Sequence, residues 1–171
     1  MRFLPHVAVL CFLCSPAAAQ VFYKAGFTYT VKGADAKLGF VDATEVGPFV
    51  IGQLGNRHIV AINVESKMER WRFTSTHNAI RSMHRRGDTL VVDAEDIVAL
   101  NPVTGVEKWR VPTNCYSSKA CNQRIRFMDH RVVVLSGFDK RDDNLMLLDA
   151  TTGSRHWPNW VSVGQIAHVV Y

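Results

Sequence analysis

One thirteen-residue phrase occurs three times in this chain, and its copies align without a gap. The copies span residues 59–71, 97–109 and 145–157. Each copy has four apolar residues, then Asn or Asp, then a turn and a short second run that ends in tryptophan. The tryptophans lie 38 and 48 residues apart. Repeats at this spacing indicate a solenoid, a propeller or another array of small units.

The composition of the phrase predicts a β-hairpin. Four apolar residues are too few for a helix but enough for a buried strand. The side chain of Asn or Asp caps a turn, and glycine adopts a positive φ at little steric cost. The capping residues are Asn63, Asn101 and Asp149, and the glycines are Gly105 and Gly153. In the first copy Ser66-Lys67 replaces Thr-Gly, so we expect that turn to be less favourable.

The tryptophan that closes each hairpin is expected to be a core residue rather than a ligand for a cofactor. These residues are Trp71, Trp109 and Trp157. A large aromatic side chain at a fixed offset can wedge between neighbouring sheets, as propeller repeats use such residues. Truncating a buried tryptophan typically costs roughly 3–5 kcal/mol.

The phrase belongs to a longer unit of four short strands. The predicted strands are 37–41, 48–52, 57–63 and 69–73 in the first unit, 79–83, 89–93, 97–100 and 106–111 in the second, and 124–128, 131–136, 145–149 and 154–157 in the third. A further strand is predicted at 21–33, and no segment shows a sustained helical period. Units of four antiparallel strands describe propeller blades. We therefore predict an all-β, partial β-propeller, with blades at about 37–73, 79–111 and 124–158.

These residues resemble the repeat of the PQQ-like (quinoprotein) β-propeller family. The resemblance is carried by Ala99-Leu100-Asn101, Thr104-Gly105 and Trp109-Arg110, and in the other copies by Ala61-Ile62-Asn63, Trp71-Arg72, Leu148-Asp149, Thr152-Gly153 and Trp157. The family usually has seven or eight blades, and three blades cannot close a ring. Residues 161–171 look like the start of a fourth unit. We therefore expect an incomplete propeller over residues 20–171, which is part of a larger protein or closes its ring with another chain.

The N-terminal residues predict a secretory signal. Arg2 gives a basic start, a short apolar core follows, and three alanines precede Gln20. We therefore expect residues 1–19 to be removed in a secretory or periplasmic compartment. In an oxidising compartment, Cys115 and Cys121 are expected to form a disulfide that clips a loop.

The chain is basic, with a formal net charge of +5, and one group of arginines stands out. Residues 81–86 are predicted to contain a basic turn, His84-Arg85-Arg86. The matching strand of the next unit, at 124–128, contributes further arginines to this basic group. The candidate contact residues are Arg81, Arg85, Arg86, Arg124 and Arg126. A solvated loop and a contact with an acidic partner or lipid headgroups both remain open. A signal peptide makes nucleic acid an implausible partner.

The sequence contains little that indicates catalysis. Neither a Gly-x-Ser-x-Gly motif nor a paired-histidine metal motif is present. Resemblance to quinoprotein dehydrogenases would imply pyrroloquinoline quinone stacked on a tryptophan, with calcium, but no carboxylate cluster of calcium-ligand spacing is present. We expect no catalytic, cofactor or metal site, so the chain is predicted to be a non-enzymatic scaffold.

The position of the first phrase suggests a setting for the scaffold. An early blade that follows a signal peptide and an aromatic-rich strand is similar to the N-terminal luminal propeller of subunit 1 of the endoplasmic reticulum (ER) membrane protein complex. That resemblance implies a part in membrane-protein insertion or folding on the luminal side, with other subunits as partners. The alternative is a bacterial periplasmic propeller, either a scaffold for outer-membrane protein assembly or part of a quinoprotein dehydrogenase.

Overall fold

The fold was analysed in a computed structural model, which describes residues 21–24, 27–30, 38–76, 79–94, 96–113, 122–137, 143–159 and 161–162. All regular structure in these residues is β-strand. A hairpin of β1 (Val21–Lys24) and β2 (Phe27–Thr30) comes first, within the stretch for which one longer strand was predicted. The remaining strands form three antiparallel four-stranded sheets.

Each sheet is a meander in which sequence neighbours pair. The first contains β3 (Phe40–Val46), β4 (Phe49–Leu54), β5 (His58–Asn63) and β6 (Glu69–Thr74). The second contains β7 (Ser82–Arg86), β8 (Thr89–Asp93), β9 (Ile97–Leu100) and β10 (Glu107–Val111). The third contains β11 (Asn122–Met128), β12 (Arg131–Gly137), β13 (Asp143–Asp149) and β14 (Val161–Ser162).

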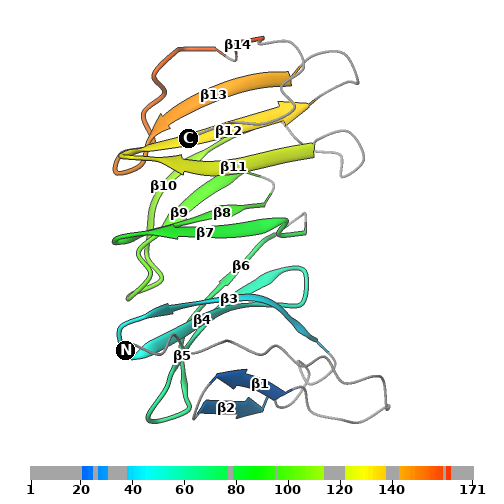
Figure 1. Ribbon diagram of the computed structural model, residues 1–171, viewed down its shortest axis with the longest axis vertical. Coiled ribbons are helices and arrows are strands. Elements are labelled where there is room, and N and C mark those ends of the chain that lie inside the picture. The colour runs from blue at the N-terminus through cyan, green and yellow to red at the C-terminus, as the bar shows by residue number, and fades with distance from the viewer. Residues whose placement is uncertain are drawn as a thin grey trace, which may run out of the picture.

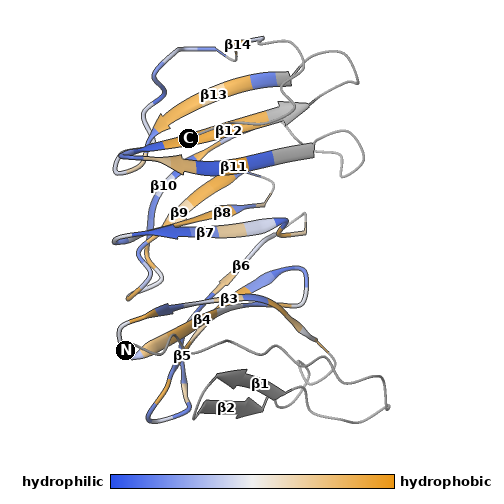
Figure 2. Ribbon diagram, in the orientation of Figure 1, coloured by the Kyte–Doolittle hydropathy of each residue, from blue (hydrophilic) through white to orange (hydrophobic). Residues whose placement is uncertain are grey.

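The two middle strands of the second sheet carry apolar residues on both faces because a neighbouring sheet covers each side. All residues of β8 and β9 are buried, including Leu90, Val91, Val98 and Ala99. One core lies between the first and second sheets, and a second core lies between the second and third sheets. Figure 2 shows the corresponding hydrophobic colouring along β8, β9, β12 and β13.

The sheets stack face to face and come closest at their first strands. Figure 1 shows the three sheets as successive layers, and β7 contacts both β3 and β11. Sheets that converge at one strand and fan apart beyond it are the blades of a propeller, with the first strands innermost. The prediction of an all-β partial propeller is therefore confirmed.

Two predicted strand positions were wrong. The first strand of the first sheet is Phe40–Val46 rather than 37–41, because the turn of its hairpin is Gly47-Pro48 and Gly47 has a φ of 55°. In the second sheet, His84-Arg85-Arg86 lies in strand β7 rather than in a turn. The reversal comes one residue later, at Gly87, which also has a φ of 55°. This strand was not recognised in the sequence because β7 is rich in polar residues, and its inner edge faces the propeller axis.

The last strand of the third sheet was also misplaced. Residues 154–157 contain a single bridge, Leu148↔Arg155, and the strand that pairs with β13 is Val161–Ser162. In the first two copies the second residue after tryptophan is Phe73 or Val111, and both pack against a core. The third copy has Pro158 and then Asn159 at these positions, which are residues that strands disfavour, and Asn159 is exposed.

Three predictions concern residues outside the described ranges. These are the signal peptide at 1–19, the disulfide between Cys115 and Cys121, and most of the expected fourth unit at 163–171. The structure therefore does not test them.

Candidate functional site

Two tryptophans join neighbouring sheets at their outer corners. Trp71 lies at the end of the first phrase, and its Nε1 donates a hydrogen bond to the carbonyl oxygen of Pro102 in the second sheet, at 3.2 Å. Trp109 makes the equivalent bond to Ala150 of the third sheet, at 3.0 Å. Both indoles are buried, with exposed fractions of 9% and 8%. Each of the first two copies of the phrase thus binds the turn of the next copy.

Glycine is required beneath each of these indoles. A Cβ atom on Gly105 would lie 2.6 Å from Cγ of Trp71, and one on Gly153 would lie 2.7 Å from Cδ2 of Trp109. Both glycines also have a positive φ, of 74° and 72°. The glycine of the phrase therefore serves two purposes, since it allows the turn and leaves room for the tryptophan of the preceding sheet.

The Asx residues hold these turns in the predicted way. Oδ1 of Asn101 accepts hydrogen bonds from the backbone N–H groups of Val103 and Thr104, at 2.9 and 3.0 Å. Oδ1 of Asn63 and Oδ1 of Asp149 accept the equivalent pairs in the other copies. In the first copy Lys67 takes the glycine position with a φ of 56°, a strained angle for a residue with a Cβ atom.

The third tryptophan differs from the other two. Trp157 is only partly buried, and it packs edge-on against His156 with ring centroids 5.0 Å apart. Within the described ranges, its Nε1 has no hydrogen-bond acceptor like those of Trp71 and Trp109.

The first two tryptophans do not fit a quinone cofactor. A quinone would need an open indole face to stack on, but Trp71 and Trp109 are buried and each has a glycine turn pressed on its ring. Groups of three or more His, Cys, Asp or Glu side chains able to hold a metal ion are not found in the described part of the chain.

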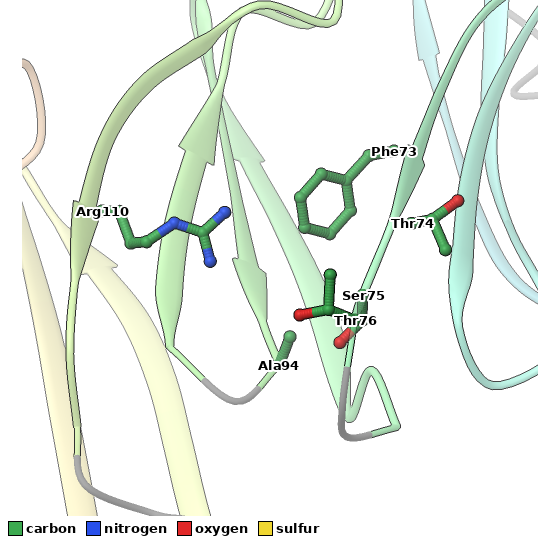
Figure 3. A pocket seen from close by; sticks show the side chains of 6 residues that line it. All are labelled: Phe73, Thr74, Ser75, Thr76, Ala94 and Arg110. Carbon is green, nitrogen blue, oxygen red and sulfur yellow. The ribbon is translucent and has the colours of Figure 1, made fainter.

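The clearest pocket of the described residues is small and lies at the outer edge between the first two sheets. Figure 3 shows its lining, which is Phe73, Thr74, Ser75, Thr76, Ala94 and Arg110. Its cavity volume of about 30 Å³ has room for only a few water molecules. The guanidinium of Arg110 is bound to Glu107 at 2.7 Å and to Asp96 at 3.3 Å. This pocket is therefore too small for an organic substrate.

Among the candidate arginines, Arg81 stands apart. Its guanidinium forms an ion pair with Asp93, whose side chain is fully buried at the end of β8. Burial raises the pKa of Asp93, and the hydrogen bond and charge of Arg81 partly offset this effect. Arg81 therefore acts as the structural partner of a buried carboxylate, a pairing that buried charges need.

The other four arginines lie on two neighbouring inner strands. Arg85 and Arg86 lie on β7, and Arg124 and Arg126 lie on β11. All four side chains are exposed, and β7 and β11 are in contact. Figure 2 shows the hydrophilic colouring of these stretches of both strands. We call these four arginines the inner basic surface. Since Ile125 packs into the core with the second sheet, Arg124 and Arg126 point to the other face of β11, away from β7.

The described contacts of Arg85, Arg126 and Arg86 are with carbonyl oxygens and one distant carboxylate. Nη1 of Arg85 donates to the backbone carbonyl of Glu45 on β3, at 3.0 Å. Nη1 of Arg126 donates to the carbonyl of Ile125, at 2.8 Å. Arg86 lies 3.7 Å from Asp129, an exposed and long pair that stabilises little. Sequence reasoning missed Asp129, which takes a positive φ of 49° in the turn after β11.

His84 lies on β7 next to Arg85 in the sequence. Its side chain is half-buried on β7, and Nε2 is 3.2 Å from Oγ of Ser82. Burial lowers the pKa of His84, and the charge of Arg126 lowers it further, while Asp42 on β3 acts in the opposite direction. Charged residues of both neighbouring inner strands therefore influence the pKa of His84.

Comparisons with known proteins extend to solved structures only. No family model matches the chain, and no curated protein matches it by sequence. AztD from Citrobacter koseri superposes with a TM-score of 0.56 and 17% identity, over 87% of this chain and 45% of that one. BamB from Moraxella catarrhalis superposes with a TM-score of 0.54 and 17% identity, over 77% of this chain and 39% of that one. A europium-containing methanol dehydrogenase superposes with a TM-score of 0.53 and 15% identity, over 72% of this chain and 27% of that one.

This chain thus spans less than half the length of each of these three proteins. The described residues contain no helix long and apolar enough to cross a membrane. At such identities the likeness shows the fold alone, and one fold hosts many functions. The comparisons and the sheet topology together identify a partial β-propeller, in agreement with the PQQ-like repeat of the sequence.

Proposed function

We propose that this chain is a non-enzymatic propeller scaffold of the secretory pathway, which binds other subunits of a membrane-associated complex on the luminal side of the ER. The observation that carries the proposal is the inner basic surface, where four exposed arginines lie on the innermost strands of two neighbouring blades. Exposed positive charge of this kind attracts an acidic partner over a distance.

The more specific part of the proposal is a role in inserting or folding membrane proteins. It is supported by the resemblance of the first phrase to the early blade of the ER membrane protein complex. The buried tryptophans further support a scaffold role. Each indole packs on a glycine of the next sheet and donates a hydrogen bond to it, so the sheets are held rigidly together. Rigid elements present contact residues with less loss of conformational entropy on binding.

Capture from native membranes tests this proposal. The chain, expressed with its own N-terminal residues and an affinity tag, is isolated from gently solubilised ER membranes after cross-linking, and the recovered proteins are identified. We expect subunits of a membrane-protein insertion complex. Recovery of chaperones alone, or of no partner, would contradict the proposal.

A second candidate function is a periplasmic scaffold for the assembly of outer-membrane proteins. The observation that favours it is the likeness to BamB, which covers 77% of this chain. The same capture from bacterial envelopes separates the two candidates by the partners that are recovered. Adding pyrroloquinoline quinone and calcium to the purified chain tests the dehydrogenase alternative, for which a quinone absorption band and a higher melting temperature would be expected. The scaffold proposals predict neither change.

A further inference from the structure

We propose that Lys67 and Phe40 close the first sheet to a second copy of this chain, so that Trp157 of the third sheet is left for a partner chain whose blade carries an Asx-capped glycine turn. This inference rests on the proposed scaffold function and names the kind of partner that the third sheet fits. The contacts made by Trp71 and Trp109 define what such a partner must offer. We call each contact a tryptophan joint, in which an indole meets a glycine at a positive φ and a backbone carbonyl oxygen of the next sheet.

The turn of the first sheet cannot take part in a tryptophan joint. Asn63 caps this turn as in the other copies, but the residue four positions later is Lys67 rather than glycine. At the equivalent position of the second sheet, a Cβ atom on Gly105 would lie 2.6 Å from Cγ of Trp71, much closer than two carbon atoms pack. The Cβ atom of Lys67 would therefore block the indole of a second copy.

The first sheet also covers its own far face, which is the face turned away from the second sheet. Leu38 and Phe40 pack against the buried apolar residues of this face. The ring of Phe40 lies over Gly52, where an added Cβ atom would be 2.7 Å from it. The second sheet has Val92 at the equivalent position, and this side chain packs against the first sheet instead. The first sheet therefore lacks both the turn and the free face that a preceding blade would need.

The third sheet, at the other end of the stack in Figure 1, carries the indole of a further joint. Its phrase begins the outer strand at Arg155, which bridges to β13, and Trp157 follows two residues later, in the register that Trp109 has in the second sheet. The guanidinium of Arg155 fixes this segment, because it donates hydrogen bonds to the carbonyl oxygens of Pro158 at 3.3 Å and Pro112 at 3.1 Å. Trp157 is therefore held in position although its ring is only partly buried.

The far face of the third sheet is less covered than the equivalent face of the second sheet. Leu145 and Leu147 are partly buried, whereas Ile97 and Ala99 at the equivalent positions are fully buried against the third sheet. A second copy that joined here through its first sheet would use a different surface on each copy, so the contact would propagate into rings or filaments. The closed first sheet prevents this association and leaves the third sheet to a different chain.

Sedimentation of the full chain and its variants tests the closure of the first sheet. The open variant carries Phe40→Ala, Gly52→Val and Lys67→Gly, which remove the ring, introduce the valine of the second sheet and create a glycine turn. Its average mass should rise with concentration, and adding Trp157→Ala should abolish this rise. The matched control carries Lys67→Ala in place of Lys67→Gly, which removes the charge and retains the Cβ atom. This control and the wild-type chain should not associate through Trp157.

Site-specific cross-linking identifies the partner and does not depend on the folding of these variants. The probe is the tagged full chain with a photoreactive benzophenone at the exposed position of Asn159, activated in ER membranes. We expect cross-linked peptides from another chain, in which Asn or Asp precedes a glycine by four residues. Trp157→Ala should lower the cross-linked yield at least about tenfold, since tryptophans dominate the binding energy of interfaces. Val106→Ala, which trims an exposed apolar residue of the second sheet, should leave the yield within about twofold.

Several outcomes would overturn the inference. They are association of the wild-type chain that Trp157→Ala abolishes, equal association of the open variant and its matched control, a folded open variant that stays monomeric, and cross-links to a second copy of this chain or to peptides without such a turn. Capture of the same membrane-complex subunits by wild type and by Trp157→Ala would overturn this inference and leave the proposed function intact. Capture of no subunit by either chain would instead contradict the proposed function.

Discussion

The second and third sheets carry the same thirteen-residue phrase, yet only in the second does the outer strand run through the tryptophan. Trp109 is followed by Arg110 and Val111, and the strand continues through both residues. Trp157 is followed by Pro158 and Asn159, and the chain bends there instead. The difference shows that the tryptophan alone does not make the joint. In the second sheet the buried Val111, two positions further on, also packs against the core, and among the described residues no further sheet follows Trp157.

The largest expected effect comes from removing the tryptophans. Trp109→Ala should lower the free energy of unfolding by about 3–5 kcal/mol, since it empties a buried site. Trp157→Ala should cost no more than about half as much, because its ring is only partly buried and the effect scales with the apolar area that is covered. Urea-induced unfolding followed by circular dichroism measures both. Equal losses would show that the third joint is as well packed as the second.

Substitution of the glycines beneath the tryptophan rings should have the next largest effect on stability. Gly105→Ala and Gly153→Ala place a Cβ against Trp71 and Trp109 as well as at a positive φ, so each should cost about 2–5 kcal/mol. Gly87→Ala is the matched control. Gly87 has a φ of 55° but open space around it, so this change should cost only about 1–2 kcal/mol. If the three changes had the same cost, the tryptophan contact would contribute nothing.

The residue two positions after the tryptophan is tested by exchanging valine and asparagine between the second and third copies of the phrase. Val111→Asn should cost about 2–4 kcal/mol, because a buried methyl pair is lost and an amide without a partner is buried. Val106→Asn, the same chemical change at an exposed site, should change the stability by less than about 0.5 kcal/mol. Asn159→Val should not destabilise the chain. A loss with Asn159→Val would show that the bend after Trp157 needs the amide.

Most of the fold could be predicted from the phrase because its signals are local. Asn101 and Gly105 fix a turn through bonds within five residues, and the apolar runs before them fix the buried strands. The first strands could not be placed as well. Their exposed edges tolerate arginine and aspartate, so the residues of β7 lack the alternation that marks a half-buried strand.

The candidate site could be predicted only in part, because the roles of its residues depend on contacts between strands and sheets. The sequence identified the basic residues, but it could not separate Arg81 from the other four. That separation depends on Asp93, which becomes buried beside Arg81 only when β7 and β8 pair. In the same way, the neighbourhood of β7 and β11 depends on how the sheets stack, and such long-range placement leaves no local pattern.

The smallest expected effect distinguishes Asn101 from Asp149, which cap equivalent turns. Hydrogen bonds from the backbone and side chain of Thr152, and from the backbone of Thr151, lower the pKa of Asp149. A carboxyl group with a lowered pKa in the folded state stabilises the fold above its unfolded pKa, and this contribution is lost as the pH falls through the folded pKa. The melting temperature should therefore fall between about pH 4 and about pH 2 by more in wild type than in Asp149→Asn.

The converse change completes this comparison. Asn101→Asp should make the fall in melting temperature on acidification larger than in wild type, because it adds a second carboxylate cap with the same backbone donors. At pH 7 both variants should melt close to wild type, since Asn and Asp cap turns about equally well. Other carboxylates, such as Asp88, titrate in all three proteins, so the difference between variants reports the caps alone. Identical acid profiles for the three proteins would show that the bonds to Asp149 do not favour its charged form.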